Sequence, residues 1–443
     1  MKRLLLLSAL CMSMINASAQ ITTKNVVKKR VNPGFTNGWG LDKRYSFDMF
    51  DTSFSNFQQY HPLRRKLSFF QDLGDVGTPY KNLQFEVYSK PGFDLGLNPY
   101  NAYNFTHANS LYFNAPVPFT YFYYTQGRSG DERSMINFEA QHTQNINKNL
   151  NIAINYRSIT NNSFYLRQKS SMKNLQATSL YTSKNKRYQA AVNLAWNKVI
   201  TQESGGILKD SLSDSLFRNF PRIIRPVPVS LNNANNIVRY REHSIKQYYW
   251  FGGNKPDSFN KNYYPKFGLT HTFIMQKQAA YYTDQDKDRY FYDTLSNYQN
   301  YKTNDSLGMQ LYSNRVGLIK QNYNFYGLYF NGGITYDYFK VYQGANAINF
   351  RKFNNYNLSA DANFILDIKN KYLGGDANYF ISGYNAGDYC LRGYLGASTF
   401  TSKYNFKTLI SGNSQLKTPT RLETATLSNH YTWQNDFNKT FTN

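Results

Sequence analysis

The sequence predicts an all-β fold: an antiparallel up-and-down transmembrane β-barrel with short periplasmic turns and long extracellular loops. Three observations predict it: segments that alternate apolar and polar residues, an N-terminal export signal, and many aromatic residues in a polar chain. The 443 residues include 40 Tyr and 33 Phe, yet mean hydropathy is only -0.63. Barrel strands are apolar on alternate residues only, so mean hydropathy stays low, and aromatic side chains form girdles at both membrane interfaces.

The N-terminus has the layout of a secretory signal peptide. Lys2 and Arg3 precede the apolar run LLLLSALCMSMI, and Ala17 and Ala19 offer a cleavage site of the small-x-small type. We therefore expect export and a mature chain that begins at Gln20. One of the two cysteines is lost with the signal peptide, so we expect no intramolecular disulfide.

The clearest strand is KRYQAAVNLAWNK, residues 186–198, which alternates almost without fault. Successive side chains of a strand face opposite sides, so this segment has one apolar face and one small or polar face. Residues 136–141 and 150–157 alternate in the same way on either side of the polar turn NINKN, which predicts a hairpin. The predicted lipid-facing residues are Ile152, Ile154, Val192, Leu194 and Trp196. The predicted pore-lining residues are Asn151, Asn155, Arg157, Gln189 and Asn193.

Further alternating segments follow the same pattern along the chain. They are residues 175–179, 267–275, 358–366, 373–381 and, with weaker alternation, 427–433. Short polar turns such as SKNKR, KQNY and DIKNK are separated by longer connections, namely residues 158–173, 200–243, 276–308 and 340–355. Short turns at one end and long loops at the other are typical of an outer-membrane barrel. Residues 252–265 are an exception, because this predicted periplasmic turn is fairly long.

Three parts are expected along the chain. They are a signal peptide over residues 1–19, an N-terminal periplasmic arm over residues 20–65, and the β-barrel over residues 66–443. The arm is basic and rich in Asn and Gly, with few clean alternations. Either entry into the barrel lumen or simple disorder accounts for this composition.

Three early blocks resemble the conserved N-terminal blocks of a porin family of the Bacteroidetes. They are FFQDLGDVGTPYKNL, PFTYFYYTQG and NFEAQHTQNINKNLNIAINYRS. ESGGI and PVPVSLNNA are similar to the first long loop of that family, and SNHYTWQND resembles one of its later strands. The resemblance implies an outer-membrane barrel with no catalytic residues to carry over. Members of the family are longer, whereas this chain stops at NKTFTN, so we expect a truncated reading frame that lacks its closing strands.

Local motifs for metal binding or catalysis are weak. The six histidines lie far apart, so neither a metal site nor a cofactor is expected. DQDKD places Asp284, Asp286 and Asp288 at EF-hand-like offsets, but Arg289 stands where Gly is needed and Leu295 where Glu is needed. A solvated charge run explains this stretch better. No local nucleophile–base pair or carboxylate pair is visible, so we do not expect an enzyme.

The charge of the chain bears on its partners. The formal net charge is +24 at pH 7, with basic residues spread along the whole chain. Such a charge fits a nucleic acid, an anionic membrane surface or a pore that concentrates anions. Export disfavours a nucleic-acid partner, so outer-membrane lipid and small hydrophilic solutes are the expected partners. The number of copies that associate is left open.

We therefore expect a porin in the outer membrane of a Gram-negative cell. Small hydrophilic solutes would cross by passive diffusion, and Arg157 with its neighbouring amides would favour anions. The alternative is a non-conducting outer-membrane barrel that acts as a surface interaction scaffold, with its lumen filled by the N-terminal arm. A soluble exported β-protein or enzyme is the third possibility.

Overall fold

The computed structural model describes most of the chain between residues 37 and 442. The described residues are 37–39, 47–48, 61–63, 69–72, 76–83, 92–127, 135–162, 166–207, 229–254, 264–285, 291–292, 302–320, 327–345, 349–368, 371–400 and 405–442. The predicted signal peptide, the predicted mature start at Gln20, and Asp286, Asp288, Arg289 and Leu295 lie outside the described residues.

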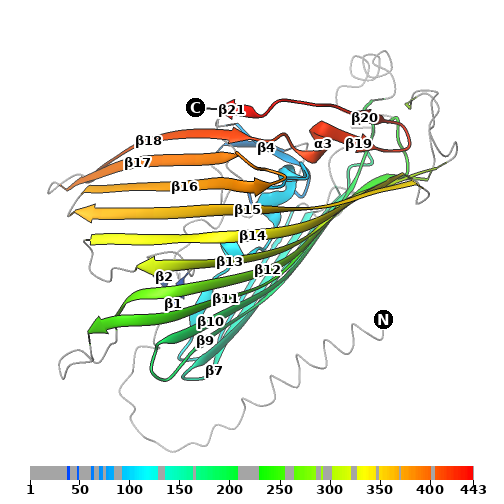
Figure 1. The fold of residues 1–443 in the computed structure, drawn as a ribbon. Coiled ribbons are helices and arrows are strands. Elements are labelled where there is room, and N and C mark those ends of the chain that lie inside the picture. Colours follow the sequence, from blue (N-terminus) through cyan, green and yellow to red (C-terminus); the bar gives the residue numbers. More distant parts are fainter. Residues whose placement is uncertain are drawn as a thin grey trace, which may run out of the picture.

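One antiparallel sheet of 14 strands dominates the fold, and each strand pairs with its neighbour in sequence until β21 pairs with β18. The strands are β6 (Phe119–Gln126), β7 (Met135–Asn147), β8 (Leu150–Asn161), β9 (Ser170–Thr182), β10 (Tyr188–Gln202), β11 (Ala234–Asn254), β12 (Tyr264–Asp284), β13 (Thr303–Lys320), β14 (Gly327–Ala345), β15 (Asn349–Ile368), β16 (Lys371–Gly383), β17 (Tyr389–Phe400), β18 (Asn405–Lys417) and β21 (Thr440–Thr442). The predicted all-β, antiparallel up-and-down fold is confirmed. Figure 1 shows the strands side by side in a strongly curved sheet. Among the described pairings, β6 and β21 are its two edges, so the barrel is not closed.

The curved sheet has two chemically different faces, as the alternation predicts. Large apolar side chains are exposed on the outer face; examples are Ile154, Leu175, Leu269, Val316, Ile334 and Leu373. The inner face carries mainly polar side chains. Because successive residues of a strand point to opposite sides, the hydrogen-bonded register sets which residues share a face. Leu194 lies opposite Ala177 of β9 and His243 of β11, all on the outer face.

Connections alternate between the two ends of the sheet largely as predicted. Residues 148–149, 183–187, 369–370 and 401–404 join strands at the short-turn end, and residues 203–233 and 285–302 join strands at the other end. The connection between β11 and β12 is the long exception that the sequence shows. The predicted long connection over residues 340–355 is wrong, because β14 reaches Ala345 and β15 begins at Asn349. The turn between β16 and β17, at the same end of the sheet, is also short. Gly383 makes it possible, because its φ is +101° and an added Cβ would lie 2.0 Å from the Tyr356 carbonyl oxygen.

The predicted last strand over residues 427–433 is wrong. Instead, α3 (Arg421–Thr424) leads into β19 (Ala425–Leu427), which forms a separate two-stranded sheet with β20 (Thr432–Gln434). Asn429 between them is fully buried, and its backbone N–H donates to the Asp305 carboxylate at 3.0 Å. This contact, 124 residues distant in sequence, outweighs the weak local alternation.

The chain before the sheet folds into small elements inside its curve. They are β1 (Asn37–Trp39), β2 (Phe47–Asp48), β3 (Phe70–Asp72), β4 (Tyr80–Asn82), η1 (Asn98–Tyr103), η2 (His107–Asn109) and β5 (Tyr112–Asn114). We call residues 92–115 the inner segment; Figure 1 shows this cyan stretch behind the strands of the sheet. The first strand of the 14-stranded sheet, β6, begins at Phe119. The start of the barrel domain at residue 66 stays a prediction.

Helices contribute little to the fold. In the part of the chain that the structure describes, no helix has both the length and the apolar character needed to cross a membrane.

Candidate functional site on the inner face of the sheet

The structure places the ten predicted site residues on the expected faces of the sheet. Asn151, Asn155, Arg157, Gln189 and Asn193 share the inner face, and Ile152, Ile154, Val192, Leu194 and Trp196 share the outer face. Contact with solute or with lipid stays a prediction for all ten. The inner-face residues are not all accessible to solvent, however, because several of them are buried against the inner segment.

We call six inner-face residues the covered patch. They are Asn145, Asn174, Gln176, Asn193, Asn197 and Glu242. All six bond to the inner segment, and the last five are no more than 3% exposed. At its centre, Ser110 Oγ lies 2.9 Å from both Asn193 Oδ1 and Gln176 Nε2. Buried polar groups need such partners, so the segment and the sheet satisfy one another.

Glu242 is the most demanding group in the covered patch, because it is a carboxylate only 1% exposed. The backbone N–H of His107 donates to its Oε1 at 2.5 Å, and His107 Nδ1 lies 3.0 Å from the same atom. The Tyr240 hydroxyl donates to Oε2 at 2.5 Å. A buried charge is tolerated only with several close partners. The first turn of η2 therefore holds the inner segment to β11.

The side-chain amide of Asn197 bonds both backbone groups of one residue of the inner segment, as a neighbouring β-strand would do. Its Oδ1 accepts from the Phe105 N–H at 2.8 Å, and its Nδ2 donates to the Phe105 carbonyl at 2.9 Å. Asn174 Nδ2 donates to the Tyr103 carbonyl at 2.6 Å. These side-chain amides satisfy backbone groups of a segment that has little regular structure of its own.

An apolar cluster closes this side of the interior at the long-loop end. Leu63, Val76 and Tyr103 pack there against inward side chains of the sheet such as Met172 and Val199. Burial raises the pKa of Tyr103 well above its usual range, so the phenol stays neutral. Its hydroxyl donates to the Thr78 carbonyl at 2.9 Å.

The positive charge of Arg157 is paired with other groups of the chain. Its Nε lies 3.2 Å from Glu139 Oε1, and its guanidinium stands over the Phe105 ring, 4.8 Å from the centroid. Both partners of the ion pair are largely buried, so the positive charge of Arg157 is mostly compensated at this position.

A second group of inner-face residues, on β13–β18, has a different environment. We call it the open patch; its members are Arg315, Asn331, Asp361, Asn363, Asp376, Arg392 and Asn413. Among them, Asn363, Asp376 and Asn413 are half-exposed, and Arg392 is exposed. Asn331, Asn363, Asp376, Arg392 and Asn413 lie directly opposite one another across five strands.

The polar groups of the open patch are hydrogen-bonded to one another along the wall. Arg315 forms a bidentate pair with Asp361, with N–O distances of 2.8 and 2.5 Å. Gly317 and Gly333 make room for it, since an added Cβ at either position would lie about 3 Å from the guanidinium. Asn363 donates to the Asp376 carboxylate, and Arg392 Nε donates to Asn413 Oδ1 at 3.0 Å.

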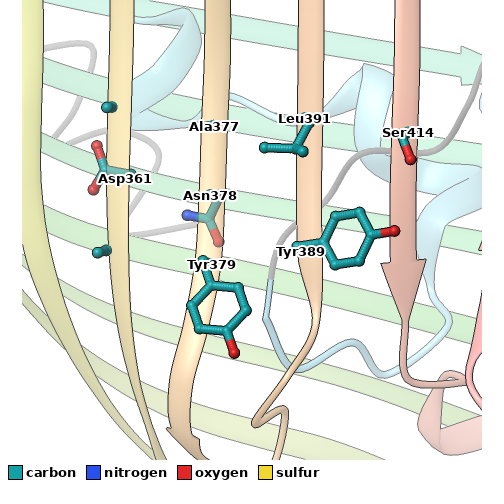
Figure 2. A pocket seen from close by; sticks show the side chains of 9 residues that line it. Asp361, Ala377, Asn378, Tyr379, Tyr389, Leu391 and Ser414 are labelled. Carbon is teal, nitrogen blue, oxygen red and sulfur yellow. The ribbon is translucent and has the colours of Figure 1, made fainter.

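The outer face has a shallow groove of about 530 Å³ over β15–β18. Tyr379, Leu391 and Tyr389 stand around it (Figure 2). Alanines at positions 360, 362 and 377 also line it. The groove is apolar and belongs to the face that the alternation assigns to lipid. Among the described residues, no three His, Cys, Asp or Glu side chains gather in a way that could hold a metal ion.

An up-and-down antiparallel sheet with an apolar outer face and a polar inner face is the arrangement of outer-membrane β-barrels. The family described as "Putative porin" matches residues 37–443. The chain therefore belongs to this porin family.

Two solved structures are similar to the chain, both of the ferric-catecholate import receptor Fiu from E. coli K12. The closed form shows 10% identity and a TM-score of 0.37, with 65% of this chain and 47% of that chain covered. The open form shows 9% identity and a TM-score of 0.38, with 66% and 52% covered. The chain thus spans about half the length of that receptor. No match was found among curated proteins.

Proposed function

We propose that the protein is a pore of the outer membrane through which small hydrophilic solutes diffuse passively. The observation that carries this proposal is the cross-strand row of polar side chains in the open patch, which is accessible from the interior. Such a row keeps a path hydrated, and passive diffusion requires only diameter and charge. In this proposal the outer face contacts lipid, and the chain reaches the membrane through a cleaved signal peptide.

We also propose that the pore prefers anions, with Arg392 as the group responsible. Arg157 is compensated by Glu139, and Arg315 is compensated by Asp361. Arg392 is exposed on the inner face and bonds a neutral amide, Asn413. An exposed cation in a confined, low-dielectric wall raises the local concentration of anions.

A non-conducting scaffold is the second candidate function, and the covered patch favours it. The inner segment occupies the inner face of β9–β11 through buried hydrogen bonds, and a filled interior would not conduct. The function would then belong to the loops of the long-loop end.

Reconstitution in planar bilayers separates the two candidates. The proposed pore gives discrete current steps, and its liposomes swell in solutions of small sugars. A preparation that inserts into liposomes but neither conducts nor swells them would contradict the pore and leave the scaffold.

A further inference from the structure

Two tyrosines stand beside the polar row of the open patch. Tyr394 of β17 lies directly opposite Gly374 of β16, and Tyr372 of β16 lies opposite Gly396 of β17. Both tyrosines belong to the inner face and are half-exposed. Their ring centroids are 6.3 Å apart, and the ring planes meet at 60°. The pair therefore forms one aromatic surface on the inner wall.

The glycines explain how these rings lie. A Cβ added at Gly374 would be 2.3 Å from the Tyr394 ring, and one at Gly396 would be 2.0 Å from the Tyr372 ring. Each ring therefore leans across the neighbouring strand and covers a glycine. One side of the ring packs on the wall, and the other side faces the interior. Any larger residue at Gly374 would push the Tyr394 ring out of this position.

The polar row runs next to this aromatic surface. Asp376 and Arg392 are each two residues along a strand from Gly374 and Tyr394, which is roughly 7 Å on the same face. Asp376 offers acceptor oxygens, Arg392 offers donors, and Asn363 and Asn413 offer both. Asp376 and Arg392 lie opposite each other on adjacent strands, so the surface suits a ligand with many groups that both donate and accept.

We propose that Tyr372 and Tyr394, together with Asp376 and Arg392, form a carbohydrate-binding surface inside the pore. A sugar ring has an apolar C–H face that stacks on an aromatic ring and hydroxyls that donate to Asp376 and accept from Arg392. Unbranched oligosaccharides are the ligand class, because the row crosses several strands and offers successive positions. This inference rests on the proposed pore for its route of access.

Two measurements test the inference separately from the pore. Maltotriose is the probe, and a polyethylene glycol of similar hydrodynamic size is the control, because it lacks hydroxyl-bearing rings. Block of the ionic current reports binding within a conducting pore. Calorimetric titration in detergent reports binding whether or not the protein conducts. We expect maltotriose, and not the polymer, to block current and to release heat.

Four variants locate the binding. Tyr394→Ala is expected to weaken binding roughly tenfold, whereas Tyr394→Phe keeps the ring and changes it by no more than about twofold. Gly374→Ala displaces the ring and should weaken binding as Tyr394→Ala does. Tyr379→Ala is the matched control, because Tyr379 lies on β16 but faces outward.

The outcomes divide cleanly. Binding that Tyr394→Ala and Gly374→Ala weaken and Tyr379→Ala leaves intact supports the inference, even where no current is seen and the pore itself fails. Current without block or heat overturns the inference and leaves the pore. Equal block by the polymer, or loss of binding in the Tyr379→Ala control alone, also overturns it.

Discussion

The covered patch and the open patch have the same sequence pattern but differ in their exposure to solvent. Both consist of polar side chains that alternate with apolar ones along strands of one sheet. In the covered patch, Asn193 and Glu242 are buried against the inner segment, whereas Arg392 in the open patch is exposed. The pattern specifies that a face is polar. It does not specify whether water or another part of the chain satisfies that face.

The first prediction compares a buried carboxylate with a partly solvated one. Glu242→Ala should lower the free energy of unfolding by about 3–5 kcal/mol, because His107 and the Tyr240 hydroxyl lose a buried partner. Asp361→Ala is the matched change in the open patch. Asp361 is more exposed than Glu242, so the loss of its hydrogen bonds to Arg315 should cost less, about 1.5–3 kcal/mol. Urea unfolding in detergent measures both, and equal losses would remove the distinction between the patches.

The second prediction compares the two faces of the sheet. Leu194→Arg should impair membrane assembly, since a lipid-facing cation near the midplane costs about 2–4 kcal/mol. Asn413→Arg, on the half-exposed inner face, should assemble normally. Heat-modifiable migration in gels reports assembly. If Asn413→Arg proves the more damaging change, the assignment of inner and outer faces is reversed.

The covered patch also changes what is expected at Asn193. Alternation alone places this residue on a hydrated wall, where an arginine would be tolerated. Asn193 is 0% exposed and bonds Ser110, so Asn193→Arg should displace the inner segment.

The third prediction concerns the strand-like contact of Asn197. Asn197→Ala leaves the Phe105 N–H and carbonyl without their partner, at a cost of about 1–3 kcal/mol. Hydrogen–deuterium exchange should accelerate at Phe105 and its neighbours and stay unchanged in β17, which carries Arg392 of the open patch. Uniform acceleration over the whole sheet would show that the inner segment is not a separate unit.

The fourth prediction has the smallest effect on stability. Arg392→Gln should change the free energy of unfolding by less than about 0.5 kcal/mol, because the side chain is exposed. It should nevertheless reduce anion preference in reversal-potential measurements across a salt gradient. Arg157→Gln is the control that should leave the preference unchanged. If Arg157→Gln reduces the anion preference and Arg392→Gln does not, Arg157 is the residue responsible for selectivity.

The wall strands could be predicted from sequence because their signal is local. In residues 188–197 every second side chain is apolar, and steric rules turn this into two faces without knowledge of the rest of the chain. The same signal failed at residues 427–433, where alternation is weak and the buried contacts of Asn429 with β13 decide the local fold.

The inner segment could not be predicted in the same way. Residues 98–114 lack the alternation of a wall strand, and their anchors are distant: 83 residues separate Ser110 from Asn193, and 135 separate His107 from Glu242. The one available signal was a run rich in Asn and Tyr just before the first wall strand. An asparagine that lines water and one that binds a backbone carbonyl look identical in a sequence.

By itself, the sequence determined the strongly alternating strands and their two faces, because these follow from the period of side chains along one strand. Only the tertiary structure decided which inward residues are buried and which are open to solvent. That choice depends on how the inner segment crosses the sheet. Alternation alone predicts Arg157 as a selectivity residue, yet its charge is compensated by Glu139 across a strand pair. Pairing between strands and with a distant segment is a property of three-dimensional register, and no single stretch of the chain contains it.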